Sequence, residues 1–169
     1  MIDIDTAKIG FVYTFQCIGT DGRVRWEWTQ KNLMPNESRN YLMAAGLHGG
    51  PQFSTWYIGL YSGSYTPVVG DTMAAFPASA TEITADYSET VRQTLVPDAA
   101  GTGTYANVGS PAVFSFTAPV TVRGGFISSN SVKGGTTGVL LSAVLAGTAK
   151  TVAAGEQLKV VAGLSLVTA

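Results

Sequence analysis

Short runs rich in β-branched and aromatic residues, separated by glycine and proline, fill the second half of the chain. The runs expected to form strands are 104–108, 112–117, 120–128, 139–145 and 157–166. Short strands at such spacing, divided by turn residues, are typical of an antiparallel sandwich or barrel. We therefore expect an all-β fold, an antiparallel β-sandwich. Its strand order could be jelly-roll-like or immunoglobulin-like, because periodicity does not encode strand pairing.

The clearest local signal is a hairpin near the N-terminus. Apolar and polar residues alternate over 8–18 and again over 23–30, where Val24, Trp26 and Trp28 share one face. The intervening 19–22 segment, Gly-Thr-Asp-Gly, has two glycines that can adopt positive φ. The pattern predicts two antiparallel strands joined by this turn. A further apolar strand is expected over 55–61, and a less regular one over 91–96.

The domain organisation follows from length and from the absence of linkers. The chain has 169 residues, which is the length of one ordinary domain, and it shows no fixed-period repeat and no low-complexity segment. We expect an N-terminal arm over 1–7 and a single β-sandwich domain over 8–169. One short α-helix is expected near 36–45, with Pro35 in its first turn and Gly46 after its end. A single helical turn over 72–76, ended by Pro77, is also expected.

Charged residues make up only 12% of the chain, against about 25% in a typical globular domain. The surface is therefore expected to be covered largely by small neutral side chains, or to be partly hidden in contacts with other subunits. The net charge of −1 gives no electrostatic reason to bind nucleic acid or an anionic membrane. No apolar stretch is long enough for a membrane span.

The N-terminus and the single cysteine indicate the cellular compartment in which the chain is made. Asp3 and Asp5 lie where a signal peptide would need a basic region and an apolar run. Cys17 is the lone cysteine and lies among apolar neighbours, so we expect a buried, inert thiol and no internal disulfide. Both features fit synthesis in a reducing cytoplasm.

The sequence offers no convincing catalytic or metal-binding group. His48 is the only histidine and lies in a glycine-rich turn, and the chain has no G-x-S-x-G motif. Glu82, Asp86 and Glu89 have helical spacing and could form an acid/base pair or a calcium site, but we favour a solvated face beside a loop. We predict no enzymatic activity, no catalytic residue, no cofactor and no metal.

Aromatic residues are the features that could support binding. Trp26, Trp28, Trp56, Tyr57, Tyr61 and Tyr65 could form a sugar-stacking platform, fill the core or anchor a subunit interface. We favour the core or an interface. The residues proposed for contacts with other subunits are Met1, Ile2, Ile4, Trp56, Tyr57, Tyr65 and Pro67, together with the 63–77 loop.

A series of short motifs carries a resemblance to a known family. The motifs occur in the order Asn-Leu-Met-Pro-Asn (32–36) before Tyr-Leu (41–42), Thr-Trp-Tyr-Ile-Gly-Leu (55–60), Tyr-Thr-Pro (65–67), Gly-Asp-Thr-Met (70–73), Thr-Glu (81–82), Ser-Pro-Ala-Val-Phe (110–114), Val-Arg-Gly-Gly-Phe-Ile (122–127), Lys-Gly-Gly-Thr-Thr-Gly (133–138) and Val-Ala-Ala-Gly-Glu-Gln-Leu (152–158). This order resembles small structural proteins of tailed phages encoded near head genes, of the capsid decoration or cement type. The resemblance covers roughly residues 30–168, and its individual motifs are short.

The resemblance implies a role but transfers no catalytic residue. It implies a structural virion protein that binds the outside of the capsid shell, with the major capsid protein as partner, no nucleic acid and no membrane. It implies a β-sandwich that forms a small homo-oligomer, a trimer in the first place and a dimer as the alternative. The localisation implied is the capsid surface, after synthesis in the host cytoplasm. The alternative function is a tail- or fibre-associated module that recognises host glycans.

Overall fold

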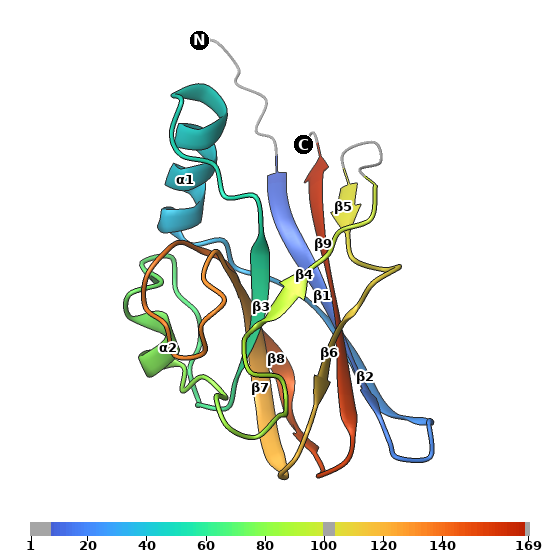
Figure 1. Ribbon diagram of the computed structural model, residues 1–169. Helices are drawn as coiled ribbons and strands as arrows, with labels where there is room; N and C mark the ends of the chain where they lie inside the picture. The colour runs from blue at the N-terminus through green and yellow to red at the C-terminus, as the bar shows by residue number, and fades with distance from the viewer. Residues whose placement is uncertain (1–7, 100–103, 168–169) are drawn as a thin grey trace.

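The computed structural model describes residues 8–99 and 104–167, which form two antiparallel sheets packed face to face (Figure 1). The predicted all-β antiparallel sandwich is therefore confirmed. The described strands are β1 (Lys8–Ile18), β2 (Val24–Lys31), β3 (Trp56–Tyr61), β4 (Gln93–Leu95), β5 (Thr104–Ala106), β6 (Ala112–Ser115), β7 (Val120–Ser128), β8 (Leu140–Val152) and β9 (Gln157–Val167). The helices are α1 (Asn36–Leu47) and α2 (Phe76–Ser79). The predicted arm over 1–7, with Met1, Ile2 and Ile4, lies outside the described residues.

The strand order combines distant parts of the chain. In the first sheet the order is β2-β1-β9, and β9 then pairs with both β5 and β6. In the second sheet the order is β4-β3-β7-β8. Strand β1 pairs along its whole length with β9, from Lys8 opposite Val167 to Ile18 opposite Gln157. The two strands nearest the ends of the chain therefore form the centre of the first sheet.

The predicted hairpin of β1 and β2 is present, but a bulge modifies it. Trp26 lies opposite Cys17 and Val24 lies opposite Ile18, so Arg25 is the extra residue. Trp26 and Trp28 are half-buried against the core, whereas Val24 is 53% exposed. The predicted shared face of these three residues is wrong at Val24, because one extra residue changes the alternation of the strand beyond it.

The main core lies between the two sheets. Strand β1 contributes Phe11, Tyr13, Phe15 and Cys17, every second residue, as period-2 alternation requires. The Phe15 ring stacks on Trp28 with a centroid separation of 4.0 Å. Cys17 is fully buried, as predicted.

A second apolar cluster covers the outer face of the second sheet. Its members are Tyr61, Met73, Phe76, Ala80, Phe126, Leu140 and Ala143. They come from β3, β7 and β8 and from the 62–80 segment that carries α2, which packs onto this face (Figure 1). Among the described residues, those facing outward from the first sheet are all at least partly exposed, so the two outer faces of the sandwich differ.

The predicted helix is confirmed as α1, which ends two residues later than expected. Gly46 stays helical, and Gly49 takes the positive φ of 64° at which the chain leaves the helix. In α2, Pro77 lies in the first turn rather than at the end, where its missing N–H costs nothing. The predicted termination at Pro77 is therefore wrong.

Candidate functional site

An apolar cleft lies at the end of the sandwich beside α1. It has a volume of about 330 Å³. Its walls come from α1, from the 52–56 segment that leads into β3, from β5, and from one end of the β1–β9 pair, where Phe11 lies opposite Leu164. Aromatic rings and leucines dominate the lining, which includes Phe11, Tyr41, Leu42, Phe53, Trp56 and Tyr105.

Three aromatic side chains form one wall of this cleft. The Trp56 ring meets Tyr41 edge-on at a centroid separation of 5.4 Å and Phe53 at 5.7 Å. The Phe53 backbone N–H donates to the Tyr41 hydroxyl oxygen at 2.8 Å, which holds the 48–55 segment against α1. Trp56 also packs on the main core. The wall is thus anchored from both the helix and the sheet.

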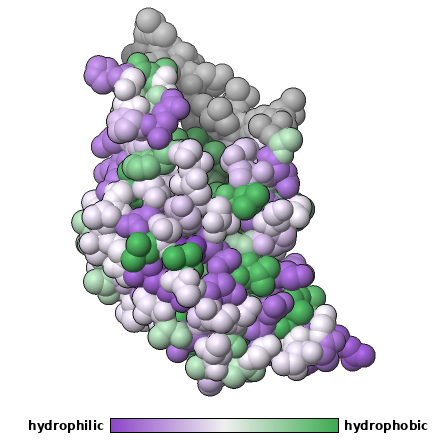
Figure 2. Space-filling view, viewed as in Figure 1, coloured by the Kyte–Doolittle hydropathy of each residue, from purple (hydrophilic) through white to green (hydrophobic). Residues whose placement is uncertain are grey.

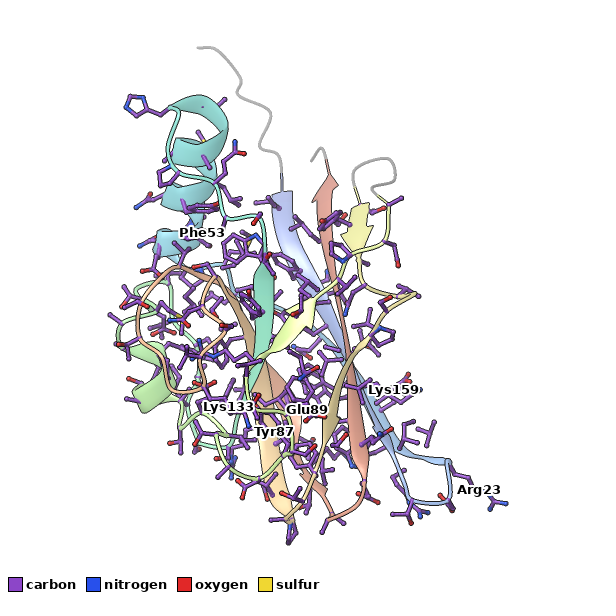
Figure 3. All side chains as sticks on the ribbon, viewed as in Figure 1. Arg23, Phe53, Tyr87, Glu89, Lys133 and Lys159 are labelled. Atoms are coloured by element: carbon purple, nitrogen blue, oxygen red, sulfur yellow. The ribbon has the colours of Figure 1, made fainter. Side chains whose placement is uncertain are left out.

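Two aromatic side chains at the rim remain accessible. Phe53 is 38% exposed and Tyr105 is 41% exposed (Figure 3 labels Phe53). The size and the aromatic lining of the cleft lie within the range of known binding pockets. The described residues that line the cleft are uncharged, and Tyr41 and Tyr105 are the titratable side chains among them.

The outer face of the first sheet is the second candidate surface. The strand register sets side chains in rows across it. One row runs Lys31, Val12, Gly163, Ala106, and the next runs Thr29, Thr14, Val161. These residues are mostly small and neutral, which gives a flat face that a second protein surface can approach closely. Figure 2 shows one side of the molecule, on which pale side chains are interspersed with hydrophilic and hydrophobic groups.

The acidic group predicted as a solvated face is structural instead. Glu82 is buried and accepts hydrogen bonds from Arg92, with Nε–Oε1 at 2.8 Å and Nη2–Oε2 at 2.7 Å. Arg92 also donates to the backbone oxygens of Asn130 and Gly135. The solvated-face interpretation is wrong for Glu82 because Arg92, ten residues on, folds back to neutralise it. The ion pair ties the 80–92 segment to the loop between β7 and β8.

Glu89 and Lys133 are likewise occupied by local contacts. The Glu89 carboxylate accepts from the Ser115 N–H, and the Lys133 ammonium lies 3.5 Å from the centre of the Tyr87 ring (Figure 3). Burial lowers the pKa of Lys133. Burial also raises the pKa of Tyr87, whose hydroxyl is buried without a hydrogen-bond partner among the described residues. These groups make packing contacts and do not converge on a common cleft.

The predicted contact residues do not form one patch. Trp56 lies in the cleft, whereas Tyr57 is half-buried on the opposite face of β3. Tyr65 packs on Phe76 and its hydroxyl donates to Asp71, which raises the pKa of Tyr65 to about 12. Pro67 borders a shallow groove between β2 and β8.

Sequence reasoning missed three of the aromatic lining residues, Tyr41, Phe53 and Tyr105. Tyr41 and Trp56 were each visible as apolar positions, but Tyr105 joins them only because β5 pairs with β9, opposite Leu164. Trp26 and Trp28 pack against the core, as favoured, and the Trp26 indole N–H donates to the Thr151 backbone oxygen. His48 is exposed beyond α1.

Over 8–99 and 104–167, no three His, Cys, Asp or Glu side chains gather in a way that could hold a metal ion. In the same ranges, neither helix has the length and apolar character to cross a bilayer. No protein-family description matches the chain, and no curated protein is significantly similar to it in sequence.

Proposed function

We propose that the chain is a non-enzymatic structural protein of a phage particle, which binds the outside of the capsid shell as a decoration protein. The major capsid protein is the proposed partner and the capsid surface the proposed location. The proposal starts from the order of short motifs over residues 30–168 that resembles this family. The aromatic cleft is the structural observation that supports it most directly.

The cleft supports a protein-binding role for a physical reason. Binding energy at protein interfaces concentrates in a few aromatic and apolar anchors that fit desolvated pockets. A cleft with Phe53 and Tyr105 at its rim and Trp56 in its wall offers such a pocket. The flat, weakly charged face of the first sheet adds contact area without requiring opposite charges on the shell.

The glycan-binding alternative receives less support. A sugar platform needs aromatic faces open to solvent, and the two tryptophans proposed for it point into the protein. Trp28 stacks on Phe15. Trp26 is half-buried, and its indole N–H donates a hydrogen bond to the Thr151 backbone oxygen. A tail location with sugar binding is therefore an outcome of the test and not a second proposal.

Co-sedimentation with expanded capsid shells that lack this protein tests the proposal. The wild-type chain is expected to bind at saturating, regularly spaced sites, and the Phe53→Ala, Tyr105→Ser variant is expected to bind at least about tenfold more weakly. Val132→Ser provides a matched control, because Val132 is 57% exposed on the loop between β7 and β8, and it lines no part of the cleft.

Immunogold labelling of intact virions separates the possible failures. Gold over the whole head, together with shell binding that depends on the cleft, supports the proposal. Gold confined to the tail, or no binding of the folded chain to shells, would overturn it. Shell binding unaffected by the cleft variant would keep the decoration role and reject the cleft as its anchor.

A further inference from the structure

Strand β2 leaves one edge of the first sheet unpaired among the described residues. The Asn32 N–H donates to the Phe11 oxygen, which fixes which backbone groups of the strand face β1. Because hydrogen-bonded pairs alternate along an antiparallel ladder, the N–H and C=O groups of Glu27, Thr29 and Lys31 point away from the sheet. Their side chains are exposed. This edge can therefore accept another strand.

We propose that this edge pairs antiparallel with the same edge of a second copy of the chain, around a two-fold axis at Thr29. In this register Glu27 of one copy lies opposite Lys31 of the other, and the symmetry repeats the pair. Residues directly opposite on one face of an antiparallel pair have close Cβ atoms, so opposite charges attract and like charges repel. The two first sheets then continue as one sheet across the dimer.

The charges of the strand disfavour the registers that are displaced from this one towards the hairpin turn. An axis at Glu27 places Glu27 opposite itself, and an axis at Trp28 places Arg25 opposite Lys31. Both arrangements bring like charges together. They also extend the pairing through the bulge at Arg25, where the edge is not flat.

An axis at Trp26 would place Arg25 of one copy opposite Glu27 of the other. However, Arg25 already forms ion pairs within its own chain. Its guanidinium lies 3.3 Å from Asp21 and 3.5 Å from Glu156 within the same chain. Lys31 forms no ion pair with a described residue, and Glu27 receives only the neutral Gln16 amide, at 2.7 Å. The axis at Thr29 thus brings together two opposite charges of β2, neither of which forms an ion pair with the described residues.

This inference does not depend on the proposed function, because it concerns two copies of the chain in solution. It differs from the trimer that the resemblance implies and agrees with the dimer given as its alternative. A two-fold contact is isologous, so the same residues act on both sides and a single substitution changes the interface twice.

Sedimentation equilibrium of the purified full chain tests the pairing. The wild-type chain is expected to show a reversible monomer–dimer equilibrium that weakens in high salt. Glu27→Lys and Lys31→Glu, each alone, are expected to raise the dimer Kd at least about tenfold. The double variant Glu27→Lys, Lys31→Glu is expected to return it close to the wild-type value. That recovery is specific to this pair of residues.

Lys159→Glu serves as a matched control, since Lys159 lies on the same face of the sheet but on β9, away from the edge. It makes the same charge change and is expected to leave the dimer intact. Far-UV circular dichroism and the unfolding midpoint check that all variants fold. A chain that remains monomeric at about 1 mM, a trimer, single reversals without effect, or a double variant that fails to recover would each overturn the proposal.

Discussion

Arg92 and Glu82 form a bidentate ion pair whose two side chains are 0% and 2% exposed, ten residues apart in the chain. Removing one partner from such a pair leaves a buried, uncompensated charge. Arg92→Met is therefore expected to lower the free energy of unfolding by about 3–5 kcal/mol. Urea denaturation followed by circular dichroism measures this loss.

A double variant distinguishes the ion pair from simple packing. Glu82→Gln, Arg92→Met leaves no buried charge, so its loss is expected to be smaller than the sum of the two single losses. Arg23→Met, at the exposed hairpin tip (Figure 3), is the matched control and should stay within about 0.5 kcal/mol of wild type. Additive losses in the double variant would contradict the coupling.

Gly59 and Phe126 are packed so closely that the position admits no side chain. A Cβ atom at Gly59 would overlap Cζ of the Phe126 ring, which belongs to the second apolar cluster. Gly59→Ala is expected to cost about 1–3 kcal/mol of stability. Gly147→Ala in β8 meets open space and is expected to be neutral or slightly stabilising. Thermal unfolding of the two variants compares them, and equal stabilities would refute the close contact.

Asn107 fills the gap between β5 and β6 along β9. Its amide oxygen accepts from the Ala162 N–H at 2.7 Å, and its amide nitrogen donates to the Val160 oxygen at 3.1 Å. The Asn107 amide thus makes the hydrogen bonds to β9 that the backbone of a neighbouring strand would otherwise make. Asn107→Ala leaves two buried backbone groups without partners and is expected to cost about 1–3 kcal/mol per group left unsatisfied. Chemical denaturation would show the loss, and a wild-type midpoint would be inconsistent with this role.

Cys17 is expected to resist thiol reagents in the folded protein. Burial and the neighbouring Glu156 carboxylate raise the pKa of the Cys17 thiol to about 12, from an ordinary value near 9. Titration with a chromophoric disulfide reagent at pH 8 should detect the thiol only after denaturation. Rapid reaction of the native chain would show that the thiol is accessible.

The same pKa shift sets the sign of a pH dependence. The folded state holds a proton that the unfolded state releases above pH 9, so this contribution to stability is complete below pH 9 and is lost as pH rises towards 12. The raised pKa values of Tyr13, Tyr61 and Tyr65 act in the same direction. The unfolding midpoint in urea is therefore expected to fall from pH 9 to pH 11. A constant midpoint over this range would contradict it.

Local pattern was sufficient to predict the sandwich, the hairpin, α1 and the approximate strand positions, because alternation and glycine placement act over a few residues. Contacts between distant residues were not predictable in this way. Glu37 lies in the first turn of α1, where a negative charge suits the helix dipole, but its carboxylate accepts hydrogen bonds from the distant N–H groups of Met73 and Leu140. Strand β8 continues through Gly147 to Val152, past the expected end at 145, because its partner β7 supplies pairing there.

The cleft is likewise built from residues that are distant in the sequence, so local pattern could not predict it. Trp56 was recognised as a candidate contact, but the residues that give it a pocket come from α1, the 48–55 segment and β5, and only tertiary pairing assembles them. The sequence pattern predicted β2 as a strand but did not show that it lies at the edge of the sheet. Its edge position follows only because β9 pairs with the other side of β1.

The central position of β9 has a consequence for synthesis on the ribosome. The β1–β2 hairpin emerges first, but the other side of β1 has no partner until residues 157–167 have been made. Pairing between residues so far apart in the sequence slows folding, so the first sheet is expected to form only after β9 has been synthesised. A nascent chain that stalls before β9 would leave this edge of β1 unpaired, and chaperone binding to such truncated chains is the expected cellular sign.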